Sequence, residues 1–193
     1  QITEKNCVGI LPNLRSFDHG NPFQTLQIFF QIIEEVLSLG KTIYLFRHSF
    51  EDIFACQWLK SLFEDDSRVK ILENDFSCFE YDEVCRQFEF LIVGRFHGVV
   101  HAYRHGIPCV ILGWAIKYQE LAESIFQTKY IFDITKPNCD VYQIFDAIRD
   151  MNQNLESNRK IILNRVEQIR NYSNCFDVMN RAIAESISRR TSA

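Results

Sequence analysis

Short apolar runs alternate along this chain with longer segments that carry apolar residues at helical spacing, and this alternation is the strongest constraint on its fold. The runs are rich in β-branched and aromatic residues and are apolar throughout, as strands buried on both faces of a sheet are. They predict strands at residues 7–13, 42–48, 68–73, 90–94, 108–113 and 129–134. The other segments predict helices at residues 22–40, 50–64, 81–88, 97–105, 117–126, 141–151, 156–172 and 176–188.

Strands that alternate with helices predict βαβ units, in which helices cover a parallel sheet on both faces. Because such crossovers are right-handed, the units build an open, doubly wound sheet, here of about six strands. A chain of 193 residues is long enough for one such domain with its own core. The predicted fold is therefore a single Rossmann-like α/β domain over residues 1–193.

Charge and composition exclude several classes of protein. A net charge of -4 argues against nucleic acid held by bulk electrostatics, and no apolar stretch reaches the length of a membrane span. The seven cysteines show no CxxC spacing and several lie in apolar runs, which predicts reduced thiols and no structural zinc. The chain begins at Gln1 with no methionine and no signal-peptide pattern. A processed product and a fragment of a longer protein both begin this way; we favour a fragment, and we expect a cytoplasmic protein.

Cations and histidines follow four of the predicted strands, at the edge where ligands bind in doubly wound sheets. Taken singly, each is also consistent with a solvated loop residue, but their recurrence on one edge favours an anion-binding cleft. They are Arg15, which follows Asn13 after the first strand, Arg47 and His48 after the second, Arg95 and His97 after the fourth, and Lys117 after the fifth.

The turn after the fourth predicted strand has further features that attract anions. A helix begins there, and its N-terminal N–H groups and dipole favour negative charge. Arg95 offers a two-pronged donor to a carboxylate or phosphate, and Gly94 and Gly98 are small enough to let the backbone approach a ligand. No GxGxxG or Walker-type loop is present, so the sequence does not support a dinucleotide or nucleoside triphosphate.

Three histidines at spacings of four residues raise the possibility of a metal site. His97 and His105 are eight residues apart on the predicted helix, which separates them by about 12 Å and rules out one shared ion. A site on His97 and His101 needs a third ligand, and Gly98 stands where an HExxH motif has its glutamate. We therefore expect no metal, and His97, nearest the strand end, is the functional candidate.

The sequence FLIVGRFHGVVHAYRHGIPCVILGWAIKYQELAESI (residues 90–125) resembles the polysaccharide pyruvyl transferase family. The family's Arg-hydrophobic-His-Gly turn is matched by residues 95–98, its G-[IV]-P step by residues 106–108, and its loop lysine by Lys117. VGILPNLR (residues 8–15) and RHSFED (residues 47–52) are similar to two further elements of the family. The resemblance covers about residues 8–126.

The resemblance implies a two-domain enzyme of the glycosyltransferase-B type, of which this chain is the C-terminal half. The N-terminal domain would then be absent from this chain, and residues 176–193 would form a terminal helix that crosses to it. The implied partners are phosphoenolpyruvate and a sugar of a polysaccharide or lipid-linked oligosaccharide. The implied location is the cytoplasm, either free or peripheral at the membrane where polysaccharide is assembled.

The implied reaction transfers pyruvate to two sugar hydroxyls as a ketal, releases phosphate and needs no cofactor. In it, His97 is the general acid, Arg15 and Arg95 bind the donor's anionic groups with Gly98 at the helix start, and His48 and Lys117 assist. Two alternatives stay open. One is a nucleotide-sugar-dependent glycosyltransferase, for which Glu120 and Glu123 are the nearby carboxylates for a ribose. The other is a non-catalytic half that only binds the donor.

Overall fold

A single six-stranded parallel sheet forms the centre of the computed structural model, which describes residues 2, 4–172 and 175–191. The strand order is β3-β2-β1-β4-β5-β6, so the chain winds outward from β1 in one direction and then, from β4, in the other. This confirms the predicted doubly wound, Rossmann-like fold. The strands are β1 (Cys7–Leu11), β2 (Thr42–Phe46), β3 (Val69–Leu72), β4 (Leu91–Val93), β5 (Cys109–Leu112) and β6 (Ile131–Phe132).

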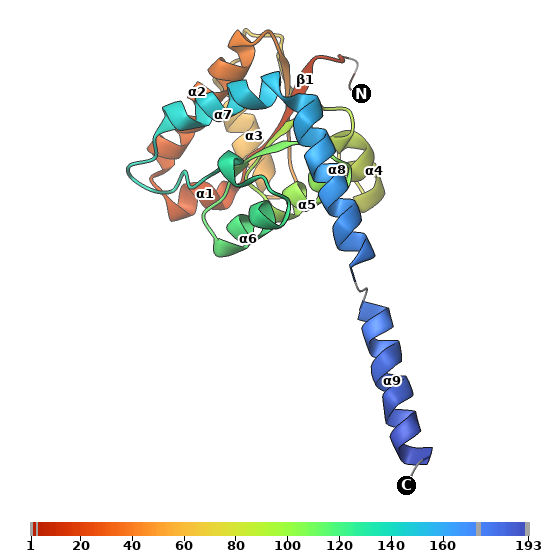
Figure 1. Cartoon of the computed structure of the whole chain (residues 1–193). Helices are drawn as coiled ribbons and strands as arrows, with labels where there is room; N and C mark the ends of the chain where they lie inside the picture. Colours follow the sequence, from red (N-terminus) through yellow and green to blue (C-terminus); the bar gives the residue numbers. More distant parts are fainter. Residues whose placement is uncertain (1, 3, 173–174, 192–193) are drawn as a thin grey trace.

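Helices cover both faces of the sheet (Figure 1). Alternate strand residues belong to the core of one layer or the other. Within β1, Val8 and Ile10 face one layer, whereas Cys7 and Leu11 face the other. The first layer contains α1 (Leu14–His19), α2 (Pro22–Ser38), α3 (Asp52–Ser61) and α7 (Val141–Gln153). The second contains α4 (Cys78–Cys85), α5 (Phe96–Arg104), α6 (Ile116–Ser124) and α8 (Leu155–Asn171).

Local sequence signals explain where several helices begin and end. The Asn21 side chain accepts hydrogen bonds from the N–H groups of Phe23 and Gln24, and Pro22 occupies the first turn of α2. After α2 and α5, Gly40 and Gly106 both adopt a φ of 73°, a conformation that glycine adopts without strain. The sequence therefore predicted these helix ends to within about two residues.

Two elements differ from the sequence-based prediction. Helix α1 was not predicted, because its six residues are too few to show a helical period; Asn13 caps it and Phe17 is buried. The strand predicted at residues 129–134 is reduced to β6, since a 3₁₀ turn (Thr128–Tyr130) precedes it.

The last helix, α9 (Cys175–Thr191), lies beyond α8 and away from the sheet (Figure 1). It contains the predicted helix at residues 176–188, and its apolar side chains Phe176, Met179 and Ile183 are exposed. Across the described ranges, no helix combines the length and apolar content that crossing a bilayer requires.

Candidate functional site

The candidate site lies at the carboxyl edge of the sheet, where the chain leaves β1, β2, β4 and β5. These strands are parallel neighbours, so the loops that follow them meet along one edge. The Asn13 side chain donates to the carbonyl of Gly94 at 2.9 Å, and the Tyr118 hydroxyl donates to the same carbonyl at 2.8 Å. Side chains that follow β1 and β5 thus hold the turn that follows β4.

Asp52 is the centre of the hydrogen-bond network at this edge. Its carboxylate is fully buried and accepts from the backbone N–H of Leu14 at 2.9 Å and of Ser49 at 3.2 Å. It also accepts from Arg95, through Nε at 2.8 Å and Nη2 at 2.7 Å. One carboxylate therefore joins the loops that follow β1, β2 and β4.

Most of the side-chain N–H groups of Arg95 donate to carboxylates of the protein itself. Its Nη2 also donates to Glu51 at 2.8 Å. Burial alone would lower the pKa of Arg95, but the hydrogen bonds and charges of Asp52 and Glu51 outweigh burial and raise that pKa. The sequence had suggested that Arg95 donates two hydrogen bonds to a ligand. Because Asp52 occupies Nε and Nη2, only Nη1 is left to face one.

Gly98 allows helix α5 to approach the sheet closely. A Cβ atom at this position would lie 2.9 Å from Val93 Cγ1 and 3.1 Å from Leu11 Cδ2. The missing side chain therefore makes room for core residues, not for a ligand as the sequence had suggested. What Gly98 presents at the helix start is its N–H group, and the N-cap residue Arg95 makes no side-chain capping hydrogen bond.

His48 and His97 lie against each other at this edge. Their ring centroids are 5.7 Å apart and the rings are nearly parallel, at 16°. Burial, followed by the nearby His101 and His97, lowers the pKa of His48 to about 4, so His48 is neutral at neutral pH. His97 is exposed at the first turn of α5. The pair thus consists of one solvent-facing imidazole backed by one that does not carry charge.

His101 and His105 both contact Asp82 on α4. The Nδ1 atom of His101 lies 2.6 Å from Oδ1 of Asp82, and Nε2 of His105 lies 3.0 Å from Oδ2. Burial acts to raise the pKa of Asp82, but the two histidines hold it below its usual value. Within the described residues, no three histidine, cysteine, aspartate or glutamate side chains are placed to share a metal ion.

Lys117 and Arg15 follow β5 and β1 at the same edge. The Nζ of Lys117 is 5.1 Å from the centre of the Phe96 ring, which adjoins His97. Arg15 forms an exposed ion pair with Asp18 at 3.0 Å. The pKa of Glu51 is lowered first by a hydrogen bond that its carboxylate accepts from its own backbone N–H and then by Arg95, with a smaller contribution from Arg15. Arg15 therefore belongs to the Glu51–Arg95 side of the edge, and Lys117 to the His97 side.

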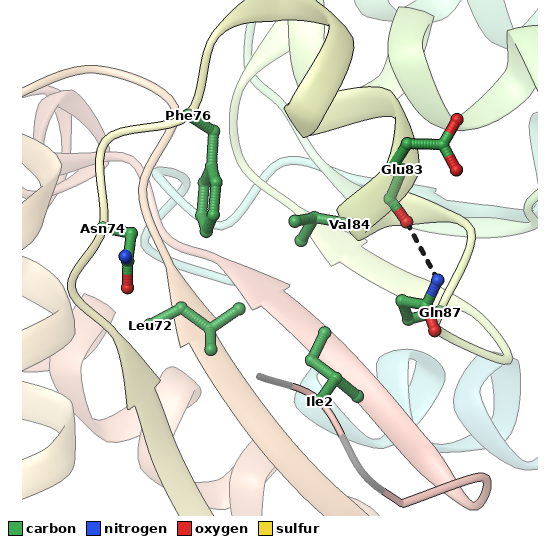
Figure 2. A pocket seen from close by; sticks show the side chains of 7 residues that line it. All are labelled: Ile2, Leu72, Asn74, Phe76, Glu83, Val84 and Gln87. Carbon is green, nitrogen blue, oxygen red and sulfur yellow. Dashed lines mark hydrogen bonds between the residues drawn. The ribbon is translucent and has the colours of Figure 1, made fainter.

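The described residues line several cavities, and two of them are compared with the candidate site. One of about 330 Å³, beside β5 and β6, is lined by Trp114, Gln119, Asp133 and Lys136 among others. The other, of about 350 Å³, is lined by Ile2, Leu72, Asn74, Phe76, Glu83, Val84 and Gln87 (Figure 2). It shares no residue with the edge described above, and its lining contains no lysine, arginine or histidine. It therefore lacks the chemistry that binds an anion.

Sequence reasoning missed the residues that hold the site together. Asp52 and Glu51 were noted only as part of the segment RHSFED, and Tyr118 and Asp82 were not proposed as site residues at all. Only the position of Asp52 at the start of a predicted helix hinted at its role, and nothing local marked Asp82 as a partner of two histidines 19 and 23 residues away.

No model of a protein family and no curated protein matches this chain. Among solved structures, it is similar to a lysine-to-methionine mutant of the O-GlcNAc transferase from Thermobaculum terrenum, with a TM-score of 0.61 at 13% identity. The match covers 98% of this chain but only 38% of the length of that protein. At this identity the likeness shows the fold, which is one that a glycosyltransferase uses; the resemblance to pyruvyl transferases stays a prediction.

Proposed function

We propose that this chain is the donor-binding half of a transferase that moves pyruvate from phosphoenolpyruvate to a sugar of a polysaccharide or its precursor, with release of phosphate. The observation that carries the proposal is the arrangement around the start of α5. There the exposed His97 is backed by the neutral His48, and the N-cap residue Arg95 makes no side-chain hydrogen bond to the first turn. The ammonium of Lys117 lies over the ring of Phe96, which adjoins His97.

Phosphoenolpyruvate carries a carboxylate and a phosphate, and the edge offers donors for both. In the proposal, the N–H groups of His97 and Gly98 and the ammonium of Lys117 bind one anionic group. Nη1 of Arg95, together with Arg15, binds the other. The ion pair of Arg15 with Asp18 is exposed on both sides, at 58% and 54%, so exchanging Asp18 for a ligand costs little.

His97 acts as the general acid in this proposal. It protonates the methylene carbon of the donor, and the adjacent carbon becomes an oxocarbenium-like centre that a sugar hydroxyl attacks. The phosphate then leaves, and a second hydroxyl closes the ketal. His48 stays uncharged beside His97, so it does not compete for the proton.

In the proposal, the acceptor sugar binds against a domain that lies outside this chain. This is in keeping with the match to the structural neighbour, which covers 38% of that protein's length. We place α9 in contact with that domain, because its exposed side chains Phe176, Met179 and Ile183 are those of a helix that packs on another surface. The pyruvyl transfer reaction itself is therefore assigned to the longer protein.

Calorimetric titration tests the proposal. We expect phosphoenolpyruvate to bind this chain, and UDP- and GDP-sugars not to. In the longer protein, His97→Ala should abolish ketal formation at saturating donor, whereas Glu83→Ala, on an exposed part of α4, should not. A His97→Ala enzyme that keeps its transfer rate would remove His97 from the reaction.

A nucleotide-sugar-dependent glycosyltransferase is the second candidate, and the cavity beside Trp114 favours it. An indole and the carboxylate of Asp133 on its walls suit a nucleobase and a ribose. Glu123 is less suited, since it already accepts a hydrogen bond from Gln119 at 2.9 Å. Binding of a UDP- or GDP-sugar, without binding of phosphoenolpyruvate, in the same titration would decide for this candidate.

A further inference from the structure

Asp82 and His101 form a close contact beside the candidate site, and neither residue binds the donor in the proposed reaction. The carboxylate and the ring are both largely buried, with 10% and 16% of their side-chain surfaces exposed. The 2.6 Å contact joins Asp82 to Nδ1 of His101. A hydrogen bond at one ring nitrogen decides which nitrogen carries the proton, so Asp82 selects the tautomer with hydrogen on Nδ1.

His48 connects this contact to the candidate general acid. Its ring centroid lies 5.9 Å from that of His101 and 5.7 Å from that of His97. His97 and His101 are one turn apart on α5, so His48 lies against both from the loop after β2. The three imidazoles therefore form one cluster, with the carboxylate of Asp82 at one end and solvent at the other.

Within the part of the chain that the structure describes, Asp82 supplies the carboxylate that contacts His101. Tyr81 packs against the ring at 4.9 Å between centroids, and its buried hydroxyl has no hydrogen-bond partner among the described residues. On the far side of Asp82, Arg104 lies 3.7 Å and His105 3.0 Å from Oδ2. The charged and titratable groups that face His101 are thus Asp82, Tyr81 and His48, with Arg104 and His105 acting through Asp82.

We propose that Asp82 and His101 are a positioning pair: Asp82 fixes the tautomer and orientation of the His101 ring, and that ring holds His48 in place behind the general acid His97. This inference rests on the proposed function. It gives a role in orienting the general acid to two residues that do not touch the donor. Asp82 acts on His101 as a buried carboxylate does when it holds a catalytic imidazole in one tautomer and orientation.

The proton count of the reaction balances without a proton on this pair. The donor's methylene carbon gains one proton from His97. The bond from the adjacent carbon to the phosphate oxygen breaks, and two new bonds form from that adjacent carbon to sugar oxygens. The two hydroxyls release two protons. One restores His97; the other leaves on phosphate as HPO₄²⁻. No oxidant or metal is required.

Nitrogen NMR of the histidine rings in this chain tests the pair without substrate. In wild type, we expect His101, identified by the signal lost in His101→Gln, to be protonated on Nδ1 in its neutral form. Asp82→Ala should move it toward the form with hydrogen on Nε2, which free imidazoles of histidine prefer. Asp146→Ala is the control, because Asp146 is an exposed carboxylate on α7 that pairs with Arg149. Wild-type His101 with hydrogen on Nε2 would overturn the inference even if the variants fail to fold.

A kinetic readout in the longer protein separates positioning of the general acid from packing. Asp82→Asn keeps a hydrogen-bond acceptor but removes the charge, so we expect kcat to fall about 100-fold and its pH profile to shift, with KM for phosphoenolpyruvate unchanged. An unchanged kcat and pH profile would overturn the inference. Failure of the proposed function looks different, since phosphoenolpyruvate would then not bind to wild type at all.

Discussion

The guanidinium of Arg95 and the carboxylate of Asp52 form a two-point pair, with Nε 2.8 Å from Oδ2 and Nη2 2.7 Å from Oδ1. The pair joins the turn after β4 to the start of α3. The backbone N–H of Leu14, in the segment after β1, also donates to Asp52. The carboxyl edge of the sheet is therefore held by a buried charge pair, and the arginine that the sequence presented as a ligand-binding group is a structural group as well.

Removal of Asp52 should destabilise the fold strongly. Asp52→Ala leaves the half-buried Arg95 without its main partner and two backbone N–H groups without an acceptor, so we expect a loss of about 3–5 kcal/mol in the free energy of unfolding. Urea titration followed by circular dichroism measures it. Asp18→Ala, which breaks the exposed Arg15 pair, is the control and should cost at most about 1 kcal/mol. Equal losses in the two variants would contradict the central role of Asp52.

Stability should depend on pH through His48. Its pKa is about 4 in the folded chain against an ordinary 6.5, so between these values the unfolded chain binds more protons than the folded one. The contribution of His48 to stability is therefore full above about pH 6.5 and is lost as the pH falls toward 4. Urea unfolding at pH 7 and pH 5 should show a smaller drop for His48→Gln than for wild type. A proton NMR titration of His48 with its midpoint near 6.5 would refute this.

Loss of the hydroxyl group should change the stability of the fold differently at two buried tyrosines. The hydroxyl of Tyr118 donates to the Gly94 carbonyl at 2.8 Å, so Tyr118→Phe should cost about 1 kcal/mol of stability. The hydroxyl of Tyr81 has no hydrogen-bond partner among the described residues, and Tyr81→Phe should be neutral or stabilising. Thermal unfolding of the two variants compares them directly. A destabilised Tyr81→Phe would mean that its hydroxyl has a partner in solution.

The sequence predicted the sheet well because each strand is a continuous apolar run with a clear start and end. Val8, Ile43 and Ile92 come from three such runs and are all fully buried in one layer of the core. Helix α1 escaped prediction because six residues do not establish a period, and its formation depends on Asn13 as a cap.

The candidate site was predicted less completely, for a physical reason. The sequence correctly placed His48 and His97 at one edge, because each follows a strand and the carboxyl ends of parallel strands meet at one edge. It did not reveal that Arg95 pairs with Asp52, 43 residues away, or that His101 pairs with Asp82. Pairings of this kind depend on side-chain distances in three dimensions, which residue types and spacing do not encode.

Lys117 should distinguish the two candidate donors. In the proposed function its ammonium binds an anionic group of phosphoenolpyruvate, whereas Lys136 lines the cavity beside Trp114. Because a hydrogen bond to a charged group contributes about 1.5 kcal/mol or more, Lys117→Met should weaken phosphoenolpyruvate binding at least about tenfold. Lys136→Met, whose side chain is 73% exposed, should leave that binding unchanged. Both are measured by calorimetry at low salt, where charge contributes most. Equal effects of the two variants on donor binding, or an effect of Lys136→Met alone, would move the donor from the start of α5 to the cavity beside Trp114.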